Sequence, residues 1–134
     1  MNIPQVSFGS LMVFTIKDGK PRASVPQLVK ASFNNNPALR GYQLTDTVQF
    51  TEEKIDGTVS KAADNFAKRL DEKYKKELPE GSKKVILTEA DFYVSPRKTE
   101  KRYFLTADGK EEDKLHKILT KSSAFYVNKF GYKR

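Results

Sequence analysis

The segment from Pro96 to Phe104, which reads P-R-K-T-E-K-R-Y-F, holds the residue types best suited to binding chemistry. Four basic residues lead directly into two aromatic residues, namely Arg97, Lys98, Lys101, Arg102, Tyr103 and Phe104. Basic side chains bind phosphates and aromatic rings stack on bases, so this combination is typical of a nucleic-acid-binding surface. We predict that the four basic residues contact phosphates and that Tyr103 or Phe104 stacks on a base. The alternative is a hairpin tip that is basic because it is solvated, with both aromatic residues packed in the core.

The C-terminal segment, residues 125–134, repeats this mixture in a looser form. Aromatic residues alternate there with Asn128 and with basic residues, and the chain ends on Lys133 and Arg134. We predict that Lys133 and Arg134 extend the basic, aromatic surface. The alternative is a last core strand followed by a charged end.

The usual residues of catalysis are scarce. Without cysteine there is no thiolate nucleophile, no disulfide and no cysteine-based metal site. The only histidine, His116, adjoins the apolar residue Leu115 in an expected helix, where a structural role is the common one. The seven glycines are scattered and form neither a Walker loop nor a dinucleotide fingerprint. We therefore expect no enzyme activity, no cofactor and no metal.

One spacing of acidic and basic residues is typical of a metal-dependent nuclease. Glu52-Glu53-Lys54 contains the acid-x-Lys pattern of some of these enzymes, with Asp46, Asp56, Glu89 or Asp91 as conceivable oxygen ligands for a hard cation. Triplets of this kind arise readily by chance in a sequence so rich in charge, so an enzyme ranks third among the functions considered.

Charge is distributed unevenly along the chain. The net charge is +8, and residues 96–134 hold 11 basic against 5 acidic residues, whereas residues 47–95 are nearly balanced. Such an excess favours acidic partners, either nucleic acid or an acidic protein. A lysine-rich surface that is merely solvated is the alternative.

Three helices are expected around these segments. An apolar stripe that includes Phe66, Leu70 and Tyr74 predicts the longest helix over residues 58–78, which Pro79 ends. A short helix is expected over residues 26–33 with Ser24 as its cap. The last helix begins near Glu111 and buries Leu115, Ile118 and Leu119.

The remaining apolar runs predict strands. They cover residues 6–16, 20–25, 42–51, 84–94, 101–106 and 124–130. Asp18-Gly19 supplies a tight turn between the first two, so the chain is expected to open with a hairpin.

The fold class that follows is α+β, in one domain covering residues 1–134, with a mostly antiparallel sheet and two main helices. From Tyr42 onward the order β-α-β-β-α-β is that of the ferredoxin-like split fold, preceded by the hairpin and the short helix. In that fold residues 101–106 form a central strand, the position from which RNA-recognition domains display stacking aromatics. The segment lacks the glycines of their consensus, so we do not assign the chain to that family.

The N-terminal residues contain no cationic leader followed by a long apolar run, so we expect a cytoplasmic protein without a membrane partner. The leading hypothesis is a small basic, non-enzymatic domain that associates with nucleic acid through the hairpin and the tail. The alternative is a protein-interaction or accessory module, including a homo-oligomeric one.

Overall fold

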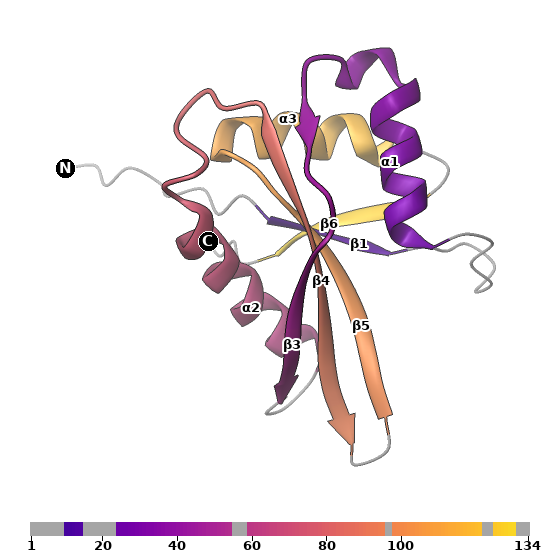
Figure 1. The fold of residues 1–134 in the computed structure, drawn as a ribbon, viewed down its shortest axis with the longest axis vertical. Coiled ribbons are helices and arrows are strands. Elements are labelled where there is room, and N and C mark those ends of the chain that lie inside the picture. Colours follow the sequence, from indigo (N-terminus) through magenta and orange to yellow (C-terminus); the bar gives the residue numbers. More distant parts are fainter. Residues whose placement is uncertain (1–9, 15–23, 55–58, 96–97, 122–124, 131–134) are drawn as a thin grey trace.

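A six-stranded sheet with three α-helices makes up the fold in the computed structural model, which describes residues 10–14, 24–54, 59–95, 98–121 and 125–130 (Figure 1). The helices are α1 (Val25–Asn35), α2 (Val59–Tyr74) and α3 (Gly109–Thr120), with a 3-10 turn, η1, at Pro37–Leu39. The strands are β1 (Ser10–Phe14), β2 (Gln43–Leu44), β3 (Val48–Lys54), β4 (Lys84–Ser95), β5 (Lys98–Thr106) and β6 (Tyr126–Phe130).

The sheet is mixed, with strand order β2-β4-β5-β1-β6 and β3 also paired with β4. Both β2 and β3 run parallel to β4, while the β4–β5, β5–β1 and β1–β6 pairs are antiparallel. Helix α2 connects β3 to β4, and a strand that returns after a crossover helix runs parallel to the strand before it. The α+β class is thus present, and the sheet is mixed, because β2 and β3 add two parallel pairs to the three antiparallel ones.

The strand order also departs from the ferredoxin-like fold. In the split fold β3 would lie beside β5, whereas here β3 pairs with β4 and the neighbour of β5 is the N-terminal strand β1. The pattern from Tyr42 onward could not reveal this, because β1 lies outside that pattern and takes the position next to β5. The ferredoxin-like prediction is therefore not confirmed.

The expected N-terminal hairpin lies mainly outside the described residues. Within them, β1 pairs with β5 through Ser10–Val13 and with β6 through Ser10–Phe14. Residues 15–23 lie outside the described part of the chain, and Val25, expected at the end of the returning strand, begins α1 instead. The cap is confirmed, since the Ser24 hydroxyl accepts a hydrogen bond from the Gln27 amide at 3.3 Å.

Alternation along β4 gives the sheet two apolar faces with different cover. Ile86, Ala90 and Phe92 belong to a cluster with Phe66 and Leu70 of α2, which we call the α2 core. Val85 and Leu87, on the opposite face of β4, belong to a second cluster with α1, α3 and β6, the α1/α3 core. It contains Val25, Val29, Leu39, Val85, Leu87, Leu105, Ala107, Leu115, Leu119, Phe125 and Val127. Period-two alternation thus lets one strand serve both layers.

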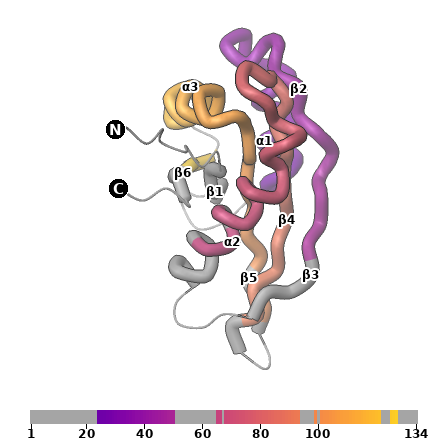
Figure 2. Tube along the Cα trace, turned by 90° about the vertical axis from the view of Figure 1, so that its left-hand side faces the viewer, coloured from indigo at the N-terminus to yellow at the C-terminus, as the bar shows by residue number. Residues whose placement is uncertain are grey.

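The two ends of the molecule differ in what covers the sheet. Helix α3 lies at the end where β2 pairs with the start of β4, and the β4–β5 ladder extends away from it toward the opposite end (Figure 1). The quarter-turned view places β3 on the side opposite to α3, β1 and β6 (Figure 2). The start of β5 therefore lies at the end of the sheet away from α3, while Tyr103 farther along β5 packs against the α1/α3 core.

Candidate functional site

Lys101, the central basic residue of the predicted hairpin site, lies against two acidic residues of β4, Glu89 and Asp91. Its ammonium nitrogen is 3.3 Å from Asp91 Oδ1 and 3.8 Å from Glu89 Oε1. The pairing follows from the antiparallel register, which sets Asp91 opposite Lys101 and Glu89 opposite Tyr103. Two carboxylates outweigh one ammonium, so this part of the sheet face does not attract a phosphate.

Tyr103 shares this face and is half-buried. Burial raises the pKa of its hydroxyl above the ordinary value, and a hydrogen bond to Glu89 raises the pKa further. The ring packs against the α1/α3 core from the side. Tyr103 is thus engaged with the protein through both its ring and its hydroxyl.

Arg102 and Phe104 project to the other face, because successive strand residues alternate. Arg102 Nη1 donates to the Lys101 carbonyl at 3.2 Å. Phe104 is fully buried in the α2 core, with its ring centroid 5.4 Å from that of Phe66 and 6.4 Å from that of Phe92. No base can reach it, so the prediction of a stacking role for Phe104 is corrected to a packing role.

The other predicted site residues stay predictions. Arg97, Lys133 and Arg134 lie outside the described residues, and Lys98 is described only through its backbone at the start of β5. The structure therefore joins Lys101 with Tyr103 on one face and separates them from Arg102 and Phe104.

The described residues do not form the metal site that the nuclease alternative requires. The backbone of Glu52–Lys54 belongs to β3, but these side chains and Asp56 are not described, and Glu89 and Asp91 are engaged by Lys101. Among the described residues no three acids or histidines gather as metal ligands would. None of the described helices is long and apolar enough to cross a membrane.

Helix α3 carries a basic feature that the sequence analysis missed. Lysines at 110, 114 and 117 of α3 and at 121, its C-cap, follow 4-3-4 spacing, which at 3.6 residues per turn places them within about 60° of arc. We call these four residues the α3 lysine stripe. All four are exposed, and the opposite side of the helix is buried through Leu115 and Leu119. The signal was present in the spacing of the lysines relative to the predicted apolar side.

The stripe is least compensated toward the C-terminal half of α3. Lys110 pairs with Glu80 at 3.2 Å in a contact where both side chains are 78% exposed. Lys114 lies 3.7 Å from Glu111. Lys117 and Lys121 have no acidic partner within the described part of the chain. The one exposed acid on the flank of the helix is Asp113.

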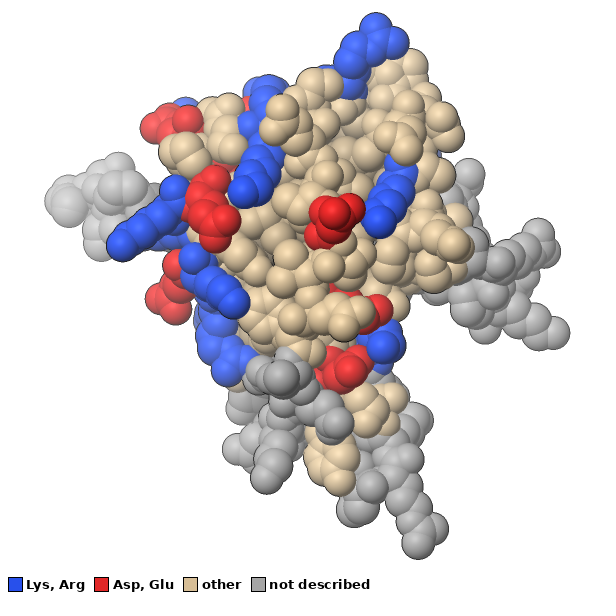
Figure 3. Space-filling view, viewed as in Figure 1, with Lys and Arg blue, Asp and Glu red and all other residues tan. Residues whose placement is uncertain are grey.

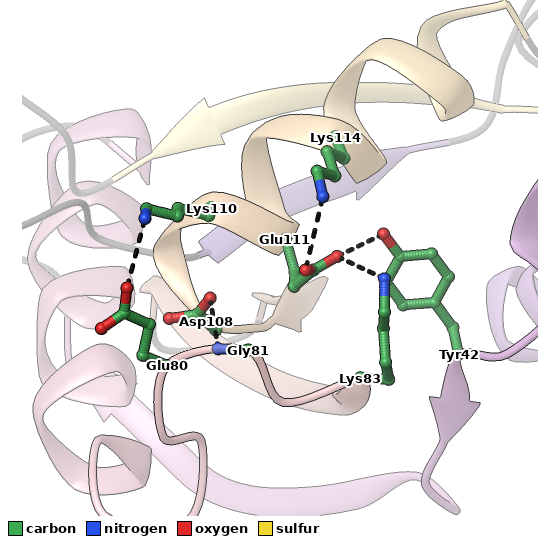
Figure 4. A network of polar contacts seen from close by, with 8 residues as sticks. All are labelled: Tyr42, Glu80, Gly81, Lys83, Asp108, Lys110, Glu111 and Lys114. Atoms are coloured by element: carbon green, nitrogen blue, oxygen red, sulfur yellow. Dashed lines mark hydrogen bonds and ion pairs between the residues drawn. The ribbon is translucent and has the colours of Figure 1, made fainter.

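A buried carboxylate holds α3 in place beneath the stripe (Figure 4). Glu111, whose side chain is only 7% exposed, accepts a hydrogen bond from the Tyr42 hydroxyl at 2.6 Å and another from Lys83 Nζ at 3.1 Å. Lys83 also lies over the Tyr42 ring, 4.6 Å from its centroid. One carboxylate thus joins the start of β2, the start of β4 and the first turn of α3.

The contacts of this network change the pKa values of Glu111 and Tyr42 in opposite directions. Hydrogen bonding to Tyr42, opposed by burial and aided by Lys83 and Lys114, lowers the pKa of Glu111, so Glu111 is ionised at neutral pH. Burial, together with the Glu111 charge and hydrogen bond, raises the pKa of Tyr42. Because Glu111 neutralises only one of the two ammonium groups near it, positive charge remains at the surface beside α3.

Charge on the face that carries β3 and β4 is arranged differently. Basic and acidic side chains alternate along one edge of that face, and its middle is mostly uncharged (Figure 3). The face therefore presents no single block of positive charge, in contrast to the stripe on α3.

Comparison with models of protein families, with curated proteins and with solved structures finds no match to this chain.

Proposed function

We propose that this protein is a non-enzymatic domain that binds nucleic acid through phosphate contacts from the α3 lysine stripe. One observation carries the proposal: four exposed lysines lie on one side of α3, and the two nearest its C-terminal end have no acidic partner among the described residues. An ordered row of ammonium groups favours a repeating anion over a single one.

The dimensions of the stripe suit a phosphate backbone. From residue 110 to residue 121 a helix rises about 16 Å, which corresponds to roughly five nucleotide steps along one strand of a duplex. Since the contacts go to phosphates, binding should depend strongly on salt and weakly on sequence.

Rigid placement of α3 supports the same role. The stripe lies on a helix whose apolar side is buried in the α1/α3 core and whose first turn is tied down by Glu111. Lysines held on a rigid element lose less conformational freedom on binding than lysines on a loop. Nucleic-acid contacts are also predicted for four residues outside the stripe, namely Arg97, Lys98, Lys133 and Arg134.

The second candidate, a protein-interaction module, draws on β6. This strand ends the sheet order, and its Tyr126 is 47% exposed, the one large apolar side chain so exposed among the described residues. Edge strands pair readily with another chain. A discrete dimer that depends on β6, measured by light scattering, would support this candidate.

Matched double variants test the proposal. Lys117→Gln with Lys121→Gln removes two charges from the stripe, and Lys101→Gln with Arg102→Gln removes two from the hairpin. By fluorescence anisotropy at about 50 mM salt, on a labelled oligonucleotide of about 20 nucleotides, we expect the stripe variant to lose about tenfold in affinity and the hairpin variant less than about twofold. Equal affinities for the wild type and the stripe variant would refute the proposal.

A further inference from the structure

A shallow pocket opens beside the Glu111 network, between α1 and the segment around β2. Its volume is about 260 Å³. The side chains that matter for its chemistry are Lys30, Phe33, Asn34, Tyr42, Thr45 and Asp46. Helix α1 and the β2 segment thus contribute comparably to its lining.

Two aromatic side chains, Phe33 and Tyr42, form part of the pocket walls, and the rest of the exposed lining is mostly polar. Phe33 and Tyr42 are each partly buried and pack against the α1/α3 core, so their positions are set by the fold. Tyr42 is further held by its hydrogen bond to Glu111. A planar heteroaromatic group is the ligand that such walls favour, because stacking requires a ring already held in place.

Some polar groups of the pocket form hydrogen bonds within the protein, and others are exposed to a ligand. The Thr45 hydroxyl accepts from the Leu87 amide at 3.1 Å and donates to the Asp46 carbonyl at 2.9 Å, so it is used within the protein. The Asn34 and Asp46 side chains are exposed at the pocket. An amide together with a carboxylate can accept and donate hydrogen bonds at the edge of a nucleobase.

A chain of contacts connects the pocket with the first turn of α3. Tyr42 lines the pocket and bonds to Glu111, and Glu111 contacts both Lys83 and Lys114 (Figure 4). Lys30 adds an ammonium group at the pocket itself. A chain of phosphates lying on the stripe would therefore reach the mouth of an aromatic pocket at one end.

We infer that this pocket receives one unpaired base of a single-stranded nucleic acid whose phosphates lie on the α3 lysine stripe. The inference rests on the proposed function and adds to it the class of nucleic acid, because a base held in a duplex cannot enter the pocket without leaving its stack. A base stacked on Phe33 or Tyr42 would make binding depend on the presence of bases as well as phosphates.

The experiment separates bases from phosphates. An oligoadenylate of about 12 nucleotides and an abasic strand of the same length carry the same phosphates, and only the former can fill the pocket. We expect the wild type to bind the oligoadenylate roughly 5- to 160-fold more tightly than the abasic strand, the range that one stacked base supplies. Phe33→Leu should remove that preference, Phe33→Tyr should keep it, and neither should change affinity for the abasic strand.

A second variant guards against a folding defect. Asn34→Ala alters an exposed residue of the same pocket, so it should reduce the preference for the oligoadenylate while leaving thermal unfolding unchanged. Equal wild-type affinities for the two strands, or a preference that survives both Phe33→Leu and Asn34→Ala, would overturn the inference. Binding of adenosine monophosphate as tight as that of the oligoadenylate would also overturn it, by assigning the pocket to a free nucleotide.

The two proposals fail in different ways. If the Lys117→Gln, Lys121→Gln variant weakens binding to both strands but the wild type does not distinguish them, the stripe binds phosphates and the pocket inference alone is wrong. If that variant binds both strands as the wild type does, the proposed function is wrong as well.

Discussion

The basic segment over residues 96–104 and helix α3 with its C-cap Lys121 each contribute four basic residues, yet they present very different surfaces. In the hairpin segment the basic residues are consecutive or nearly so, whereas the α3 lysines are spread over twelve positions. The described part of the hairpin divides Lys101 and Arg102 between two faces and sets Lys101 against Glu89 and Asp91. Helix α3 gathers all four lysines on one side.

The physical reason is the period of each element. Neighbouring residues in a strand point to opposite faces, so a dense basic run is split in two, and the partner strand decides what opposes each half. In a helix, residues spaced 4-3-4 share a side, so a sparse series is collected into a row. Local density of charge in a sequence is therefore a poor guide to density of charge on a surface.

The largest expected effect is the loss of stability on substitution of Phe104. This substitution distinguishes a packing role of Phe104 from a binding role. Phe104→Ala leaves a cavity between Phe66 and Phe92 and should lower the free energy of unfolding by about 3–5 kcal/mol. Urea denaturation measures it. A variant with wild-type stability and weakened oligonucleotide binding would instead return Phe104 to the surface and reverse the comparison.

The next effect tests what holds α3 in place. Glu111→Gln removes a buried charge that accepts hydrogen bonds from Tyr42 and Lys83, and should cost about 2 kcal/mol at neutral pH. Because the pKa of Glu111 is lowered in the folded state, its stabilisation is present above the ordinary value of 4.5 and disappears as pH falls through the folded-state pKa.

Unfolding curves of the wild type and Glu111→Gln should therefore converge as the pH falls below about 4.5. Glu80→Gln is the matched control, because the exposed Glu80–Lys110 pair should contribute between about 0 and 1 kcal/mol. A gap between wild type and Glu111→Gln that stayed constant down to the acid transition would contradict the role given to the Glu111 charge.

The stripe can be set directly against the hairpin through salt dependence. Lys117→Glu with Lys121→Glu should reduce the slope of log affinity against log salt by about 2, since each lysine contributes about 1. Reversing Arg97, Lys98, Lys101 and Arg102 together measures the hairpin, including the two side chains outside the described set. A larger loss of slope in the hairpin variant than in the stripe variant would make the hairpin the principal site.

The smallest effect is expected from the Lys101 ion pairs. Lys101 is about half-exposed, so Lys101→Gln should change the free energy of unfolding by less than about 1 kcal/mol. Denaturation at low and at high salt should give nearly the same small difference. A cost of several kcal/mol would show that the two carboxylates depend on Lys101 far more than an exposed pair allows.

Much of the secondary structure was predictable because it reflects local periodicity. The Ser24 cap, the apolar stripe of α2 and the strand nature of residues 84–94 were all evident from spacing, and the structure contains each of them. The predicted strand over residues 42–51 proved to be two, β2 and β3, each pairing with a different part of β4. Its break falls at Thr45, whose hydroxyl bonds to the Leu87 amide across the gap.

The candidate site was predictable only in its ingredients. The basic and aromatic residues of the hairpin segment are evident in the sequence, but alternation alone does not say which face a helix covers, so stacking and core packing stayed open for Phe104 until its burial decided. The α3 stripe is present in the sequence only as a spacing, because its lysines are not adjacent. Tyr42 and Glu111, which are 69 residues apart, could not be associated by any local rule.

By itself the sequence determined the composition, the excess of positive charge after residue 95, and the helices and strands whose periods are written into neighbouring residues. Tertiary structure alone decided the strand order, the burial of Phe104, the neutralisation of Lys101 and the Tyr42–Glu111–Lys83 network. The division has one cause. Period and charge are properties of adjacent residues, whereas burial and pairing depend on which distant segments pack together, and those contacts form only when the whole chain folds.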